Sequence, residues 1–238
     1  MYRCFTDEKT IQSGFQIDGD DAVHISKSLR MKPDDILTVC SADKIDYLCK
    51  INSISDGIVQ LDVLSAEPNN TEPRINVHLY QCMPKGDKLE NIVQKSVEMG
   101  VVSITPILSS RCISRPDEKS MRKKILRLQK IAHSAAEQSM RGIIPKINPM
   151  ISFKGAVEKC EDILLFYENA TDKISDTKID LDTNMNIFIG SEGGFDESEV
   201  EFAKTHNANI LSLGKRILRT ETAPIAALSA LMYRFGEL

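Results

Sequence analysis

Short apolar runs alternate with helical patterns after residue 75, and this alternation constrains the fold more than any other feature. The runs INVHLYQC, VVSITPIL, DILLFY, MNIFIG and NILSLG have the length of strands. Helical periodicity follows the first two runs, over 88–99 and within 119–140, and we expect helices after the last two as well. Such alternation predicts a parallel α/β sheet. Runs such as NIFIG are apolar throughout, as expected of strands that are covered on both faces.

The first 70 residues have a different pattern, in which short β-rich runs are separated by turn residues. The runs are YRCF, DILTVC, YLCKINSI and IVQLDVL, and one helical piece near 21–29 interrupts them. This spacing predicts a small β-barrel or an open sheet. The polar stretch 65–74 contains two prolines and is predicted to be a linker. We therefore expect two domains, 1–72 and 73–238.

Composition argues against several classes of protein. The formal net charge is −4, so the molecule as a whole is not a basic nucleic-acid binder. The start MYRCFTDEKT has no apolar signal region, and the longest nearly uncharged apolar run, 223–233, is about half the length of a membrane span. We expect a cytoplasmic protein without a membrane partner. The six cysteines form no CxxC pair, which favours buried free thiols, and the four histidines give no indication of a metal site.

Positive charge is concentrated in the middle of the chain. Residues 111–146 hold 10 Lys and Arg against 3 Asp and Glu, a net charge of +7. The flanking segments are acidic, with a net charge of −6 over 1–72 and of −8 over 147–210. The basic segment is either a solvated helix face or a phosphate-binding surface, because binding depends on the local field and not on the net charge.

The glycine-rich stretch IGSEGGFDES follows one of the predicted strands. Ligands bind beyond the carboxyl ends of strands in open parallel sheets, and glycine lets a ligand approach the backbone closely. Asp196 and Glu199 predict a capped helix that starts near Glu197. Neither GxGxxG nor GxxxxGK[ST] is present, so both nucleotide fingerprints are missing. The loop is either a ligand-binding loop or a tight turn that needs glycine for geometry alone.

A second unusual strand end lies in LSLGKRILRTETAPIAAL, residues 211–228. Its loop is more apolar than an ordinary surface loop. Thr222 is predicted to cap the helix that follows, with Pro224 in the first turn, where a missing N–H is harmless. An apolar loop with Arg219 and Glu221 suggests a pocket with a few oriented polar groups. The same two residues also fit a structural ion pair.

Six motifs resemble the bacterial 16S ribosomal RNA methyltransferases that methylate N3 of one uridine in the small subunit. They are HISKSLRMKPDD, PKGDKLENIVQKSVEMGV, SSRCISR, AAEQSMRGIIPKI, IGSEGGFDESEV and LGKRILRTETA, in the family's order over nearly the whole chain. That family belongs to the knotted SPOUT superfamily. The resemblance implies an N-terminal β-barrel of the PUA or OB type, an α/β domain with a deep trefoil knot, and a homodimer with shared active sites. Ser191 stands where the family usually has proline, and Pro224 where it has a small or apolar residue.

The resemblance also implies S-adenosylmethionine as the cofactor. Three loops would hold it in a bent shape: the region after LLFY, 190–194 and 213–222. Glu192 would bond either a ribose hydroxyl or a loop amide. The expected cofactor-binding residues are Gly190, Ser191, Glu192, Gly193, Leu213, Gly214, Ile217, Leu218 and Thr222.

Methylation of a uracil N3 sets clear chemical requirements. N3 is a weak acid, so the enzyme must align it with the methyl group and stabilise negative charge as the proton leaves. Arg219 is expected to stabilise that charge, and Glu221 is a candidate base or an orienter of Arg219. The target uracil must also leave the folded RNA to reach the enzyme, for example by flipping out of its stack.

The expected RNA partner is 16S ribosomal RNA within the assembled small subunit. The expected phosphate contacts are Arg111, Arg115, Arg122, Lys123, Lys124 and Arg141, assisted by Arg3, Lys27 and Arg30 of the first domain. Three other functions remain open. A non-catalytic RNA-binding or ribosome-assembly protein would explain the basic segment but not the two loops. A related knotted methyltransferase could act on another RNA site. A nucleotide-dependent oxidoreductase lacks its fingerprint.

Overall fold

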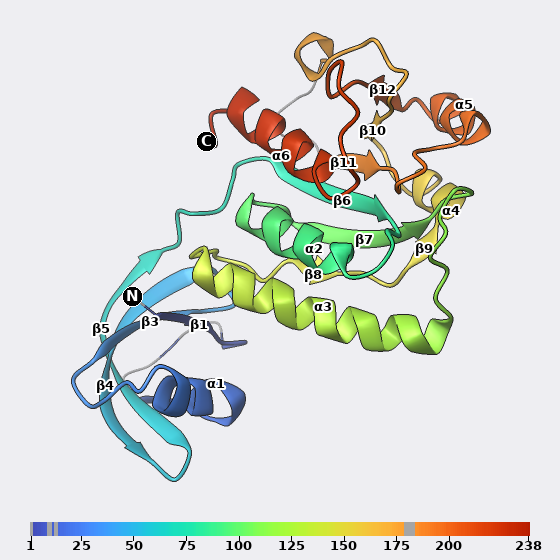
Figure 1. Ribbon diagram of the computed structural model, residues 1–238. Helices are drawn as coiled ribbons and strands as arrows, with labels where there is room; N and C mark the ends of the chain where they lie inside the picture. The colour runs from blue at the N-terminus through green and yellow to red at the C-terminus, as the bar shows by residue number, and fades with distance from the viewer. Residues whose placement is uncertain (1, 9–10, 12–13, 179–183) are drawn as a thin grey trace. The chain divides into compact units, whose positions relative to one another are not determined.

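The structure is a computed structural model that describes residues 2–8, 11, 14–178 and 184–238. The chain divides into two compact units (Figure 1). Unit 1 consists of 1–72 and 136–143, and unit 2 of 73–135 and 144–238. Residues 136–143 contain the last three residues of the long helix over 118–138 and the segment after it, and nothing in their pattern indicated that they belong with unit 1. That 1–72 and 73–238 fold as separate domains stays a prediction.

Within its described residues, unit 1 contains one five-stranded sheet in the order β1-β3-β4-β5-β2. Its strands are β1 (Tyr2–Phe5), β2 (Phe15–Ile17), β3 (Ile36–Cys40), β4 (Ile45–Ser55) and β5 (Ile58–Pro68). β1 and β3 are parallel, and the other pairs are antiparallel. Alternate residues of β4 and β5 point into the core, where Cys49, Ile51 and Leu61 are fully buried. Burial of one face explains the β-rich pattern of this segment.

Two details of unit 1 differ from the prediction. The linker expected over 65–74 begins later, because 65–68 continue β5 opposite β4 with Asp46 facing Glu67 and Tyr47 facing Ala66. The partner strand therefore overrides the polar composition of this stretch. The short strand β2 was not predicted. The expected helical piece is confirmed as α1 (Gly19–Val23), which continues into a π-helical turn, η1 (His24–Ser28).

Unit 2 is built on a parallel sheet, which confirms the central prediction. Its described strands are β6 (Asn76–Cys82), β7 (Ser103–Leu108), β8 (Lys146–Ile147), β9 (Ile151–Ser152), β10 (Ile163–Phe166), β11 (Asn184–Ile189) and β12 (Asn209–Leu211). The order is β12-β10-β11-β6-β7-β8, and β9 also pairs with β7. Every residue of β10 is buried, as expected of a strand that is covered on both faces. The short strands β8 and β9 were not predicted.

The helices of unit 2 are α2 (Lys88–Glu98), α3 (Glu118–Gln138), α4 (Phe153–Val157), the 3-10 turn η2 (Ile174–Asp176), α5 (Glu197–Thr205) and α6 (Ala223–Arg234). α6 packs against α2 and against β6 and β11, whereas α4 packs against α5 (Figure 1). The expected capping box of α5 is confirmed. The Asp196 side chain accepts a hydrogen bond from the backbone of Glu199, and the Glu199 side chain accepts one from the backbone of Asp196. Thr222 is a correction, because its backbone is already helical and its side chain makes no capping hydrogen bond.

Three further expectations concern the whole chain. All six cysteines are free, and five of them are buried, as predicted. In the part of the chain that the structure describes, no helix is both long and apolar enough to cross a bilayer. The strand order is that of a sheet with crossovers, and the trefoil knot itself stays a prediction.

Candidate active site

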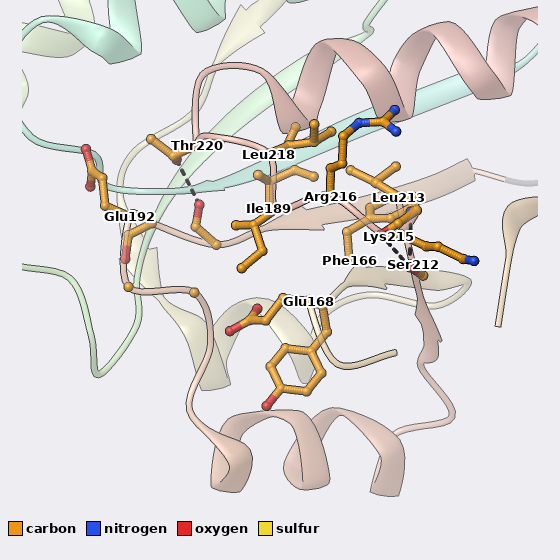
Figure 2. Close-up of a pocket in the computed structure, with 18 residues that line it drawn as sticks. Phe166, Glu168, Ile189, Glu192, Ser212, Leu213, Lys215, Arg216, Leu218 and Thr220 are labelled. Carbon is orange, nitrogen blue, oxygen red and sulfur yellow. Dashed lines mark hydrogen bonds between the residues drawn. The ribbon is translucent and has the colours of Figure 1, made fainter. Parts of the chain in front are cut away.

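A pocket of about 260 Å³ lies where three neighbouring strands of unit 2 end (Figure 2). β12, β10 and β11 are adjacent in the sheet and parallel, so the loops that follow them meet at one edge. This is the position at which open α/β sheets bind ligands. The lining residues come from 166–168 after β10, 189–194 after β11, and 212–218 with Thr220 and Ala223 after β12.

Glycine in the first predicted loop is required by the protein's own packing. A Cβ on Gly190 would lie 3.0 Å from the Cα of Gly194, and a Cβ on Gly193 would lie 3.2 Å from the Cβ of Arg111. Gly194 has a φ of +66°, and a Cβ there would lie 2.7 Å from a carboxylate oxygen of Glu168. The bare backbone therefore lets the loop fold tightly on itself and against its neighbours, at the wall of the pocket.

A buried side chain from β6 joins the two predicted loops. The amide nitrogen of Gln81 donates to the Gly190 carbonyl at 3.3 Å and to the Thr220 hydroxyl at 3.1 Å. Thr220 Oγ1 in turn donates to the Gly190 carbonyl at 2.8 Å. Both side chains are buried, so these hydrogen bonds are shielded from water. No local pattern pointed to Gln81, which lies more than a hundred residues away from the loops that it joins.

Glu192 and Glu221 meet at a single lysine. Lys88 Nζ lies 2.9 Å from Glu192 Oε1 and 3.3 Å from Glu221 Oε2. The backbone amide of Lys85 also donates to Glu192 Oε1, at 3.2 Å. Burial acts to raise the pKa of Glu192, but the hydrogen bonds from Lys88 and Lys85 hold it below its ordinary value. Glu221 thus pairs with Lys88, and the alternative of an Arg219–Glu221 ion pair is not what the structure shows.

The loop after β7 is tied to the start of α5. Arg111 donates to the Gly193 carbonyl and pairs with Asp196, each at 3.2 Å. The buried carboxylate of Glu199 accepts from the amide and hydroxyl of Ser110, at 2.7 and 3.0 Å, and from the amide of Asp196 at 3.0 Å. The glycine loop is therefore held between two braced elements.

Two family models match the chain: an RNA methyltransferase domain over residues 71–232 and an RNA methyltransferase PUA domain over 17–64. Ribosomal RNA small subunit methyltransferase E of Bacillus subtilis is 35% identical over 230 residues, covering 92% of this chain and 90% of that protein. The chain belongs to the ribosomal RNA small subunit methyltransferase E family. The resemblance carried by the six motifs is thereby confirmed, and unit 1 corresponds to the PUA domain.

A further relative and two solved structures are similar to this chain over nearly its whole length. The protein of the same name from Mesomycoplasma hyopneumoniae is 33% identical over 232 residues, covering 96% of this chain and 98% of that one. The structure from Neisseria gonorrhoeae, bound to S-adenosyl methionine, has a TM-score of 0.90 and 30% identity, covering 99% and 98% of the two chains. A methyltransferase from Legionella pneumophila, also with the bound cofactor, has a TM-score of 0.89 and 30% identity, covering 98% and 97%.

The pocket contains most of the residues expected at the cofactor. Those that line it are Gly190, Ser191, Glu192, Gly193, Leu213, Gly214, Ile217 and Leu218. Thr222 does not line the pocket and is exposed at the start of α6. Sequence reasoning placed one wall after LLFY but did not single out Phe166, Tyr167 or Glu168. It also missed Lys215 and Arg216, which lie within the predicted loop 213–222 but carry no distinguishing pattern, and Ser212, which lies just before that loop.

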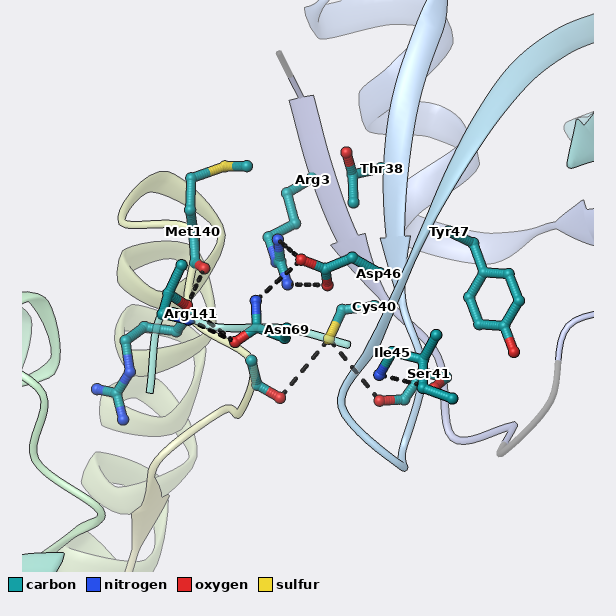
Figure 3. Close-up of polar contacts among 12 residues, drawn as sticks. Arg3, Thr38, Cys40, Ser41, Ile45, Asp46, Tyr47, Asn69, Met140 and Arg141 are labelled. Atoms are coloured by element: carbon teal, nitrogen blue, oxygen red, sulfur yellow. Dashed lines mark hydrogen bonds and ion pairs between the residues drawn. The ribbon is translucent and has the colours of Figure 1, made fainter. Parts of the chain in front are cut away.

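Two arginines that were expected to contact RNA are buried in unit 1. Arg3 is 1% exposed and pairs with Asp46, and Arg141 is 3% exposed and pairs with Glu72 at 2.7 Å. Figure 3 shows Arg3 joined to Asp46 in the polar network of unit 1. A guanidinium that is buried and paired with a carboxylate would have to break that pair before it could reach a phosphate. We therefore remove both from the RNA-contact set.

The other candidate RNA-binding residues are accessible to different degrees. Lys27, Arg30 and Lys123 are exposed. Arg122 is exposed and pairs with Glu118, and Lys124 donates to the Gly86 carbonyl. Arg115 donates to three carbonyls of its own loop, of Ser109, Ser110 and Cys112. Among the described residues, no group of three or more His, Cys, Asp or Glu could hold a metal ion.

Proposed function

We propose that this protein transfers a methyl group from S-adenosylmethionine to N3 of a specific uridine in 16S ribosomal RNA. The observation that carries the proposal is the pocket at the ends of β10, β11 and β12 in a chain of this family. Relatives that share the fold have S-adenosylmethionine bound, and curated relatives are named for the small-subunit ribosomal RNA.

The chemistry of the pocket suits that cofactor. Phe166, Ile189 and Leu218 provide an apolar wall for a purine ring, and the backbone of 190–194 provides polar groups for ribose and adenine. Glu168 lies against Gly194 at the pocket (Figure 2), opposite in charge to the sulfonium and ammonium groups of the cofactor. The flexible side chains of Lys215 and Arg216, which are also among the lining residues, supply positive charge for the carboxylate of the cofactor. When bound, S-adenosylmethionine supplies an electrophilic methyl group.

The protein must then activate the uracil ring. Arg219 is exposed beside the pocket loop, between two residues that are anchored there, and we assign it to the negative charge that develops on the ring. Glu221 pairs with Lys88 rather than with Arg219, so it does not orient Arg219, and we keep it as the candidate proton acceptor. Both assignments concern side chains that lie outside the pocket lining.

We propose in addition that the active form is a homodimer acting on the assembled small subunit. Two large apolar side chains near the pocket and α6 are strongly exposed: Ile217 at 87% and Tyr233 at 77%. The family resemblance implies a dimer, and large exposed apolar side chains are the kind of surface that a dimer interface covers. Light scattering at micromolar concentration should give twice the chain mass, and a monomer would contradict the shared active site.

The test of the activity uses small-subunit particles and naked 16S RNA from cells that lack this methylation. Each is incubated with the protein and isotopically labelled S-adenosylmethionine, and nuclease fragments are analysed by mass spectrometry. We expect labelled N3-methyluridine at one site, with faster labelling of the particle. RNA binding without any label would favour a non-catalytic assembly protein. A label on another nucleotide would favour a related methyltransferase with a different target.

A further inference from the structure

Lys88 occupies a position that links three strand ends of unit 2. It is the first residue of α2, a few residues after the end of β6. Its ammonium group lies between Glu192, in the loop after β11, and Glu221, in the loop after β12. The three side chains are 31%, 30% and 26% exposed, so their interactions are partly shielded from water.

Lys88 is the cation that balances the negative charge of both carboxylates. Among the described residues, Lys88 is the only basic side chain within 4 Å of either carboxylate. Glu221 Oε2 is buried and has no hydrogen-bond partner in the described part of the chain, so the ammonium group at 3.3 Å is its only compensation. Without that cation, two negative charges would face each other across the gap between the loops, and they would repel.

Both carboxylates are connected to the wall of the pocket. Glu192 lines it, and Glu221 follows Thr220, which lines it and bonds the Gly190 carbonyl. A shift of either carboxylate therefore moves a wall of the pocket. Lysine suits this position, because one ammonium carries three donors and can serve two acceptors at once.

We propose that Lys88 is a positioning residue of the cofactor site, which holds the loops 190–194 and 213–222 together by bridging Glu192 and Glu221. The proposal rests on the proposed function, because it concerns the same pocket. It assigns the residue a role in cofactor affinity, which is separate from the role of its partner Glu221 in the methyl transfer. A merely structural lysine of α2 would affect the stability of the protein without a specific effect on the cofactor.

The experiment measures the Kd of S-adenosylmethionine by calorimetry for Lys88→Met and the wild type. We expect the Kd to rise about tenfold, since two partly shielded ion pairs are lost and the carboxylates then repel. Lys88→Arg should bind within about threefold of the wild type, because its guanidinium also reaches two carboxylates. The double variant Lys88→Met/Glu221→Gln should recover part of the lost affinity, because it removes the repulsion.

Lys95→Met is the matched control, because Lys95 is on the same helix and pairs with Glu98 across one helical turn. Its Kd should stay within about twofold of the wild type. If Lys88→Met binds as tightly as the wild type, or if it and Lys95→Met weaken binding alike, the proposal is wrong. If Lys88→Met does not fold, Lys88→Gln replaces it with the same criteria. A wild type that binds the cofactor but labels no RNA would contradict the proposed function and leave this inference standing.

Discussion

Gly194 combines a backbone conformation and a steric contact that both exclude a side chain. Its φ is +66°, and its Cβ position lies 2.7 Å from a Glu168 oxygen. Gly194→Ala should lower the free energy of unfolding by about 1–2 kcal/mol through backbone strain. It should also weaken cofactor binding, because the displaced Glu168 lines the pocket. Chemical denaturation and calorimetry measure the two effects.

Gly57→Ala is the control that separates backbone strain from the displacement of Glu168. Gly57 lies in unit 1 with a φ of +77° and no atom within 4 Å of its Cβ position. It should show a comparable loss of stability with unchanged cofactor affinity. Equal affinities for Gly194→Ala and the wild type would show that Glu168 does not contribute to binding.

Arg219 provides a test of chemistry as distinct from binding. Removing one oriented charge-stabilising donor typically costs about 10²–10³ in rate. Arg219→Ala should therefore slow single-turnover methylation by that factor while the Kd of the cofactor changes little, since the side chain does not line the pocket. A higher pH should partly restore the variant, because more uracil then ionises unaided. Arg219→Lys should rescue only in part, since lysine lacks the planar fork.

The opposite result would also be informative. If Arg219→Ala loses cofactor affinity and stability together, with a pH profile parallel to that of the wild type, Arg219 braces the loop and takes no part in catalysis.

At the scale of elements, Glu199 joins the start of α5 to the loop after β7. It accepts hydrogen bonds from Ser110 and from the amide of Asp196, and it is buried. Glu199→Ala leaves these buried donors unpaired and should lower the free energy of unfolding by about 2–3 kcal/mol. Denaturant titration checks this value. Glu201→Ala, on the same helix but exposed, should change stability by no more than about 0.5 kcal/mol.

Elements with a local signal could be predicted from the sequence, and those that depend on a distant partner could not. The capping box at Asp196 and the apolar run of β10 are written within a few consecutive residues, so both were predicted. β8 and β9 have two residues each and form only because β7 lies beside them. The same limit applies to the site, because Gln81 and Lys88 act on loops about a hundred residues away. The loops could be recognised in the sequence, whereas Gln81 and Lys88, which hold them in place, could not.

At the scale of the whole molecule, the basic segment predicts a salt-dependent affinity for RNA. Arg122 and Lys123 are exposed on α3, and Lys124 is partly exposed. Replacing all three with Gln should weaken RNA binding and reduce the slope of log K against log salt by roughly 0.7–0.9 for each lost phosphate contact. Filter binding at several salt concentrations measures the slope.

The control variant has the same change in net charge, but its substitutions lie outside the basic segment. Replacing Lys95, Lys159 and Lys204 with Gln removes the same charge outside the basic segment. Its slope should match that of the wild type. An equal fall in both triple variants would mean that the total charge, and no local surface, governs the affinity.

The pocket described here draws all of its lining from residues 166–223. Chains are synthesised from the N-terminus, and the earlier part of a protein folds while the rest is still being made. The sheet strands β6 and β7 can therefore pair before any pocket exists, and the last wall appears only when β12 and its loop have been translated. A ligand stabilises only the form that it binds. The cofactor can consequently stabilise the finished protein against degradation, but it cannot rescue a nascent or truncated chain that ends before residue 212.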